Sequence, residues 1–180
     1  VAGVVLGNEP AVQVPIHVIA STFGTAPARC SGAYQTPAEA GYNGSLGVSF
    51  FEQDCGATCS AGAGNQYYFA CSGATCSGTA VPLVNQVQNP VALLPVDNNG
   101  VIVQLPGVPA SGSPSVNGYL VLGIGTGSNN APTAVTAYAA DAAGNFITSF
   151  NGSDYFGFID TGSNGLFFPS PSLPDCATYS

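Results

Sequence analysis

The feature that most limits how this chain can fold is the frequency with which glycine and proline interrupt it. The 180 residues contain 24 Gly and 14 Pro, and both residue types end or bend regular structure. The segments between them are short and rich in Val, Ile, Thr, Tyr and Phe, which favour strands. No apolar run approaches the roughly 20 residues that a membrane-spanning helix needs. We therefore expect an all-β fold of short strands and turns, with no membrane span.

The charge of the chain excludes several classes of function. Its net charge is −8, because nine carboxylates are opposed by a single cation, Arg29, and the only histidine is His17. Nucleic acids and anionic membrane surfaces require clustered cations, so we expect neither as a partner. One histidine and no lysine also exclude a multi-histidine zinc centre and a lysine Schiff base. Carboxylates are the remaining candidates for catalysis, and we expect no cofactor and no metal.

The cysteines favour disulfides. The six are Cys30, Cys55, Cys59, Cys71, Cys76 and Cys176. An even number in a chain of this composition indicates an oxidising compartment. The cluster over residues 55–76 could hold zinc instead, but its spacings differ from the usual C-x2-C and no histidine lies near it. No signal peptide is visible, so we expect that an N-terminal part of a secreted, periplasmic or cell-envelope protein has been removed or left out.

Local patterns predict the following elements. Alternating or continuous apolar runs between turn residues predict strands over residues 12–20, 42–51, 118–127, 134–140, 145–150 and 155–159. The first of these places His17 on its wet face. Proline at both ends makes residues 81–90 the best helix candidate. Asp97-Asn98-Asn99-Gly100 predicts the turn of a hairpin between its apolar neighbours, and the ligand spacing of a calcium loop is absent there.

The segment "FIDTGSNGLFFP", residues 158–169, places one carboxylate, Asp160, between two apolar runs. Burying an unsupported carboxylate is costly. Support is available from the backbone N–H groups opened by Gly162 and from the hydroxyls of Thr161 and Ser163. These donors stabilise the ionised form, whereas a second carboxylate beside it would make the pair share one proton and activate a water. The alternative is an ordinary turn, which Asp, Gly and Ser also favour.

The Asp160-Thr161-Gly162-Ser163 sequence with its apolar flanks resembles the second active-site loop of pepsin-like aspartic peptidases. Residues 43–48, 84–96 and 117–123 are similar to the end of the first lobe of that fold, the passage between lobes and an early strand of the second. The sequences "VQNPVAL…DNNGV" and "IDTGSNGLFFP" are closer still to a bacterial family of uncharacterised secreted proteins, domain of unknown function 3443, thought to be aspartic-protease-like.

This resemblance implies an incomplete pepsin-like fold of the double-psi β-barrel type. Residues 1–85 are then the end of the N-terminal lobe, with a cysteine-rich insertion at 55–76, and residues 86–180 are the start of the C-terminal lobe. Asp160 becomes one of two catalytic aspartates that hydrolyse peptide bonds in a polypeptide substrate, with Thr161, Gly162 and Ser163 supporting its loop.

No second Asp-Thr/Ser-Gly triplet occurs in the chain. The resemblance therefore implies that the partner aspartate lies in missing lobe segments of the parent chain, and that the 180 residues alone are inactive. Two alternatives remain open. One is a non-catalytic pepsin-like module that binds a protein or polysaccharide ligand, and the other is a β-rich secreted envelope protein in which Asp160 only forms a turn.

Overall fold

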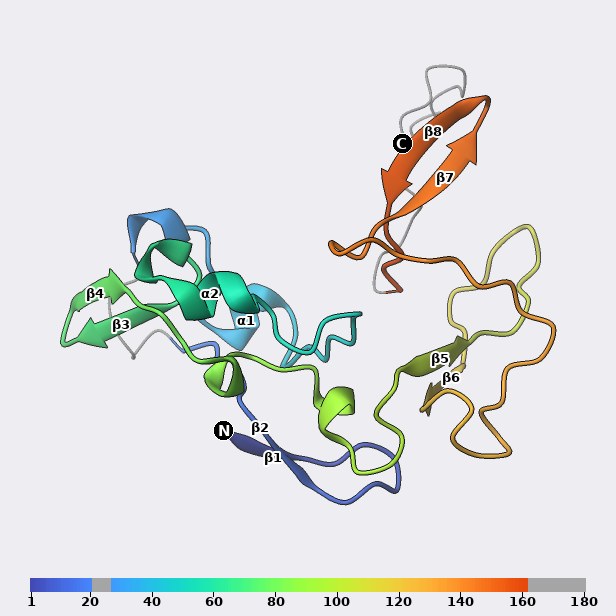
Figure 1. The fold of residues 1–180 in the computed structure, drawn as a ribbon, viewed down its shortest axis with the longest axis horizontal. Coiled ribbons are helices and arrows are strands. Elements are labelled where there is room, and N and C mark those ends of the chain that lie inside the picture. Colours follow the sequence, from blue (N-terminus) through green and yellow to red (C-terminus); the bar gives the residue numbers. More distant parts are fainter. Residues whose placement is uncertain (21–26, 162–180) are drawn as a thin grey trace. The chain divides into compact units, whose positions relative to one another are not determined.

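The computed structural model describes residues 1–20 and 27–161. Over these residues the fold is mostly strands with a few short helices, and the strands pair as small two-stranded antiparallel sheets (Figure 1). The all-β prediction is confirmed at this level. The chain divides into two compact units, Val1–Thr133 and Ala134–Ser180. The lobe boundary predicted between residues 85 and 86 stays a prediction.

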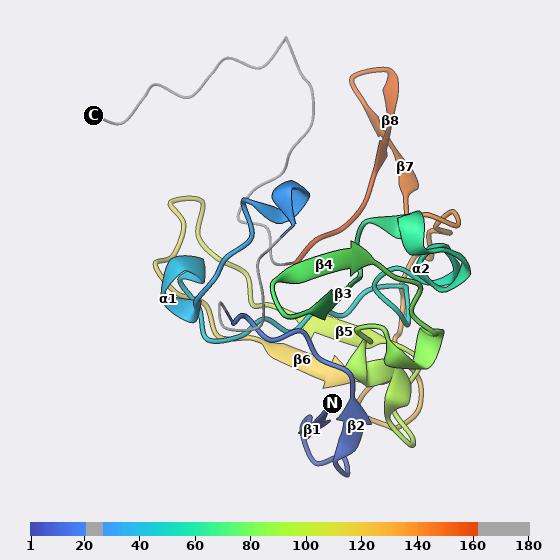
Figure 2. The same ribbon diagram turned by 90° about the vertical axis from the view of Figure 1, so that its left-hand side faces the viewer.

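Unit 1 contains three of the small sheets. Each sheet is one antiparallel pair of strands. The pairs are β1 (Ala2–Val4) with β2 (Val12–Val14), β3 (Phe69–Ser72) with β4 (Thr75–Gly78), and β5 (Val101–Gln104) with β6 (Tyr119–Leu122). Figure 2 shows β3 beside β4 and β5 beside β6. The helical turns are η1 (Ala28–Cys30), α1 (Pro37–Ala40), α2 (Ala57–Ala61), η2 (Ala63–Asn65), η3 (Leu83–Asn85) and η4 (Pro90–Leu93).

The first predicted strand is much shorter than its apolar alternation indicated. Strand β2 ends at Val14, because Pro15 has no N–H with which to continue the ladder. Val14 is buried, whereas Ile16 and Val18, which the alternation placed on the same face, are 45% and 65% exposed. His17 is exposed, as predicted.

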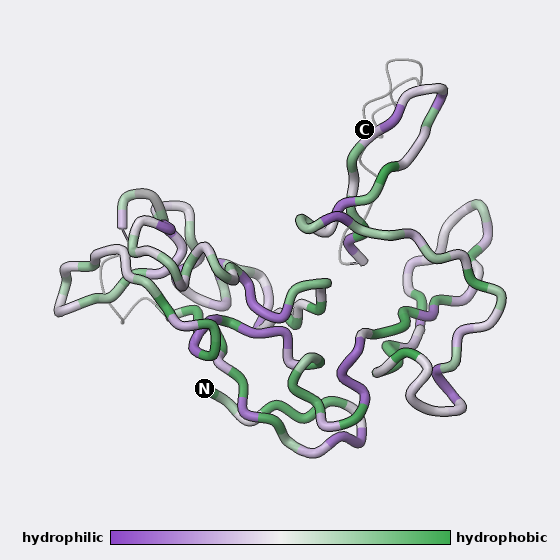
Figure 3. The backbone as a smooth tube through the Cα atoms, in the orientation of Figure 1, coloured by the Kyte–Doolittle hydropathy of each residue, from purple (hydrophilic) through white to green (hydrophobic). Residues whose placement is uncertain are grey.

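The apolar core of unit 1 is small. Among the described residues, the buried apolar side chains are Val14, Cys59, Pro90, Val91 and Leu94. Strand β2 contacts η4, and Figure 3 shows hydrophobic segments along β1 and β2 and around η4. This core joins two segments that lie far apart in the sequence.

The helix predicted over residues 81–90 does not form. A single 3-10 turn, η3, is followed by extended backbone at Gln86. The backbone groups of Val87 have partners elsewhere: its N–H donates to the Tyr68 hydroxyl at 2.8 Å, and its carbonyl accepts from the Asp54 N–H at 3.0 Å. Pro90 begins η4 instead of ending a helix, as is usual for proline at a first helical position.

The hairpin predicted around residues 97–100 is also wrong. Strand β5 pairs with β6, which confirms a strand within residues 118–127, while residues 90–93 form η4. The Asn99 side chain donates to the carbonyl of Ile124 and accepts from its N–H, both at 2.8 Å. The turn sequence is therefore held by a loop 25 residues away. No strand forms over residues 42–51.

Unit 2 contains a β-hairpin made of β7 (Phe146–Phe150) and β8 (Ser153–Gly157). Its two-residue turn is Asn151-Gly152, with φ of 52° and 79°. A type I′ turn needs positive φ at both positions, which Asn tolerates and Gly adopts freely. The strands predicted over 145–150 and 155–159 are confirmed by this hairpin, whereas the strand predicted over 134–140 does not form.

Candidate functional site

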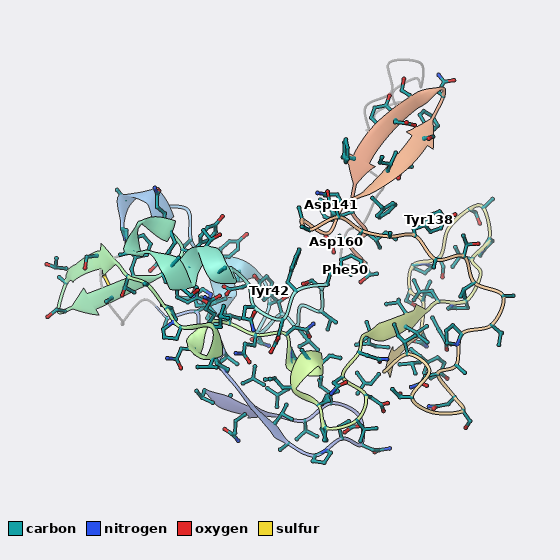
Figure 4. The ribbon with its side chains drawn as sticks, viewed as in Figure 1. Tyr42, Phe50, Tyr138, Asp141 and Asp160 are labelled. Atoms are coloured by element: carbon teal, nitrogen blue, oxygen red, sulfur yellow. A yellow bond between two sulfur atoms is a disulfide. The ribbon has the colours of Figure 1, made fainter. Side chains whose placement is uncertain are left out.

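Asp160 lies at the open end of the β7–β8 hairpin. The ladder ends at the pair Phe146 and Gly157, and the chain then continues through two apolar residues to Asp160, labelled in Figure 4. Both Asp160 and Thr161 are exposed. Gly162 and Ser163 lie outside the described residues, so the support predicted from them stays a prediction.

The apolar approach to Asp160 is exposed rather than buried. Phe156 is 77% exposed, Phe158 is 70% exposed and Ile159 is 72% exposed. Ile147, which pairs with Phe156 across the hairpin, is 58% exposed. Within unit 2 the carboxylate thus lies beside an uncovered apolar surface, where solvent reaches it. This surface would be covered if unit 2 packed against further polypeptide.

A second carboxylate, Asp141, enters the hairpin at the same end. It precedes β7 and accepts hydrogen bonds from the backbone N–H groups of Asn145, at 2.9 Å, and Ala143, at 2.8 Å. These two bonds, led by that from Asn145, hold the pKa of Asp141 below its usual value. Asp141 and Gly144 are residue types that favour turns. The structure adds that the carboxylate itself closes this turn.

Within the cysteine-rich insertion, Tyr68 connects two segments of unit 1 that are distant in the sequence. Its hydroxyl donates to Asp54 at 2.7 Å and accepts from the N–H of Val87 at 2.8 Å. Burial, together with the neighbouring Asp54 carboxylate, raises the pKa of Tyr68 to about 12, against the opposing effect of the Val87 N–H. Tyr68 is thus a neutral structural link at physiological pH.

Gln86 is a fully buried polar residue that sequence reasoning missed. Its side chain is 0% exposed, accepts from the Gly56 N–H at 2.8 Å, and donates to the carbonyls of Gly56 and Val81 at 2.9 and 3.0 Å. Gly56 has φ of +63°, which favours glycine. A glutamine in a polar stretch normally indicates a surface position, so no local signal identified this one.

The cysteines of the insertion form disulfides, as predicted. Cys55 is bonded to Cys59 and Cys71 to Cys76. Cys30 forms no disulfide with another described residue, and Cys176 lies outside the described residues. In the part of the chain that the structure describes, no three His, Cys, Asp or Glu side chains are grouped so that they could hold a metal ion, and no helix has the length and apolar character of a membrane span.

The Asp97 loop takes part in a network of polar contacts with the loop after β6. Asn130, 3% exposed, donates to the Leu122 carbonyl at 2.9 Å and to the Thr126 hydroxyl at 2.7 Å. Thr126 in turn donates to Asp97. These polar atoms hold together the loop that contains Asp97 and the loop that follows β6.

Comparison with known proteins identifies one family. The family model described as a protein of unknown function (DUF3443) matches residues 1–180. Neither the curated proteins nor the solved structures contain a match. The match covers both units and the Asp160 segment.

Proposed function

The chain belongs to the DUF3443 family, and we propose that its parent protein is a pepsin-like aspartic endopeptidase in which Asp160 supplies one of two catalytic carboxylates. The observation that carries this proposal is the Asp160-Thr161-Gly162-Ser163 sequence, which follows the β7–β8 hairpin through the apolar residues Phe158 and Ile159. We also propose that the chain forms incomplete lobes of a pepsin-like fold of the double-psi β-barrel type.

In the proposed mechanism two carboxylates share one proton and hold a water between them. The ionised carboxylate removes a proton from the water as it attacks the peptide carbonyl, and the protonated one donates to the carbonyl oxygen. Asp160 is one of the pair, and the other comes from outside these 180 residues. Thr161, Gly162 and Ser163 support the loop by donating hydrogen bonds. No covalent intermediate and no cofactor take part.

Three further observations support this proposal. The chain has no lysine, one histidine and one arginine, which leaves carboxylates as its main catalytic groups. The exposed apolar residues before Asp160 provide a surface that the rest of a lobe can cover, which would bring the carboxylate into a less polar site. The two disulfides fit an oxidising compartment, and the proposal accordingly places the protein outside the reducing cytosol.

The test compares two aspartate variants in the complete gene product. Cleavage of a denatured protein is measured across the acidic pH range, with and without pepstatin. Asp160→Asn should lower pepstatin-sensitive cleavage by roughly a thousandfold or more, as in other hydrolases that lose a catalytic group. Asp141→Asn is the matched control, because Asp141 is an exposed turn aspartate at the same end of the hairpin, and it should retain cleavage.

Retained cleavage in the Asp160→Asn protein contradicts the proposed role of Asp160. Absence of pepstatin-sensitive cleavage in the unmodified complete protein contradicts the proposed activity as a whole. Asparagine also favours turns, so the Asp160→Asn variant keeps the local turn residue while losing the charge.

A non-catalytic binding module is the second candidate, and the exposed apolar surface beside Asp160 favours it. Phe156, Phe158 and Ile159 are at least 70% exposed, and such clusters often bind a protein or polysaccharide. This candidate predicts that the complete protein captures a ligand without cleaving it, and that Asp160→Asn leaves the capture unchanged.

A further inference from the structure

Five Asn-Gly pairs occur in the chain, and the structure gives two of them opposite environments. The pairs begin at Asn43, Asn99, Asn117, Asn151 and Asn164. Asn-Gly is the sequence most open to attack by the following backbone nitrogen on the asparagine side chain, because glycine has no Cβ to hinder the approach. The extent to which each side chain is held by the fold then decides which pair reacts.

We propose that Asn43-Gly44 is a site of spontaneous deamidation in the folded chain, and that Asn99-Gly100 is protected from the same reaction. In this reaction the backbone nitrogen of Gly44 attacks Cγ of Asn43. The new N–Cγ bond replaces the Cγ–Nδ2 bond. The nitrogen of Gly44 gives up its proton to solvent, the departing amide group gains one, and ammonia leaves to give a succinimide. Water then opens either of the two C–N bonds of the ring and forms aspartate or isoaspartate. No oxidant, metal or enzyme is needed.

The environment of Asn43-Gly44 leaves the reacting atoms open. Both residues are exposed, and the sequence prediction of a strand after them is wrong, so no ladder holds this segment. A Cβ placed on Gly44 would meet no atom within 4 Å. Among the described residues, the side chain of Asn43 and the N–H of Gly44 make no hydrogen bond. The side chain can therefore rotate toward the glycine nitrogen without breaking a hydrogen bond to another described residue.

Asn99-Gly100 has the same sequence chemistry but a different environment. The amide of Asn99 is held at both ends, since Nδ2 donates to the Ile124 carbonyl and Oδ1 accepts from the Ile124 N–H, each at 2.8 Å. The carbonyl of Gly100 also accepts from the N–H of Gly123 at 2.9 Å. The reaction must first break both side-chain bonds, and two bonds of ordinary net strength slow it by roughly tenfold or more.

Deamidation of Asn43 would affect both a nearby aromatic contact and the net charge of the chain. Tyr42, which precedes the pair and is labelled in Figure 4, packs edge-on against Tyr34 with ring centroids 6.5 Å apart. Isoaspartate adds one carbon to the backbone beside Tyr42 and should disturb this ring contact. Either product adds one negative charge to a chain whose net charge is already −8.

The test follows each pair by peptide mass mapping while the chain is kept folded in mildly alkaline buffer. A methyltransferase specific for isoaspartate serves as a second readout. In the folded chain, Asn43 should react at least roughly tenfold faster than Asn99. In urea, with the disulfides intact, the two rates should converge, because both residues are followed by glycine and the difference depends on the fold.

Two variants localise the reaction. Gly44→Ala should slow modification at Asn43, since the added methyl group hinders the backbone nitrogen, and it fits the open space there. Asn43→Gln should remove the fast phase altogether. Equal rates at Asn43 and Asn99 in the folded chain, or faster reaction at Asn99, would overturn the proposal. So would a rate difference that persists in urea.

Discussion

Gln86 and Gln88 lie two residues apart, but their side-chain hydrogen bonds contribute very differently to the stability of the fold. The Gln86 amide is fully buried and makes three hydrogen bonds to the backbone of Gly56 and Val81. The Gln88 amide makes one exposed bond, to the Leu83 carbonyl at 3.1 Å. Removing a buried amide leaves its backbone partners without a bond and without water, and that loss costs more than the bond itself contributes.

The first prediction concerns these two glutamines. Gln86→Ala should lower the free energy of unfolding by about 3 kcal/mol, because it leaves buried backbone groups unsatisfied. Gln88→Ala is the matched control and should lower it by about 0.5 kcal/mol, the effect of one exposed bond. Urea denaturation of both variants measures the difference, and equal losses would contradict the structural role of Gln86.

Tyr68 gives a prediction for alkaline pH. Its pKa in the folded chain is raised to about 12, above the unfolded value of about 10. The folded state therefore holds the phenol proton more tightly, so the stabilisation is fully present below about pH 10 and is lost as the pH rises toward 12. Unfolding free energies measured by urea denaturation across this range should fall with pH.

The variant Tyr68→Phe isolates that effect. It should be about 1 to 2 kcal/mol less stable near neutral pH, because the Val87 N–H loses its acceptor. Its stability should also fall less steeply between pH 10 and 12. Tyr67→Phe is the control, because Tyr67 is 73% exposed, and it should behave like the unmodified chain. An unchanged pH dependence in the Tyr68→Phe variant would argue against this assignment.

At the scale of elements, a turn sequence gave a hairpin only where the strands on both sides of it also pair with each other. Asn151-Gly152 joins β7 and β8 through the positive φ values that its turn requires. The Asp97–Gly100 sequence carries similar turn residues, but Asn99 bonds to Ile124 and β5 pairs with β6 instead. Turn-favouring residues therefore predicted the hairpin correctly at Asn151-Gly152 and wrongly at Asp97–Gly100.

The disulfide across β3 and β4 gives a prediction at this scale. Cys71 and Cys76 face each other in the register of the hairpin. The double variant Cys71→Ala with Cys76→Ala should lower the free energy of unfolding by about 2 kcal/mol, the chain-entropy value for so short a loop. Urea denaturation without reductant measures this loss.

The adjacent pair in the same register provides the control. Ser72 and Thr75 face each other one step nearer the turn and are exposed. Replacing both with alanine should cost less than about 1 kcal/mol. If this control loses as much stability as the cysteine variant, the covalent bond is not what holds the hairpin.

At the scale of the whole molecule, four small sheets among the described residues and a core of few apolar side chains leave much apolar surface uncovered. Isolated two-stranded sheets are marginally stable in water. In unit 1 the disulfides and the buried amides of Gln86 and Asn130 add to the core. In unit 2 the exposed apolar residues before Asp160 fit the proposal that further polypeptide completes a lobe around it.

The composition and the local sequence determined the class of fold, the disulfide chemistry of the insertion and the β7–β8 hairpin, because each depends on residues close together in the chain. They also identified Asp160 as the carboxylate to examine. The tertiary structure decided which distant partners pair. Val87 bonds with Asp54 and Tyr68 in place of forming a helix, and Asn99 binds a loop 25 residues away. Such partners are chosen by three-dimensional packing, in which buried polar groups must find hydrogen bonds wherever the fold provides them.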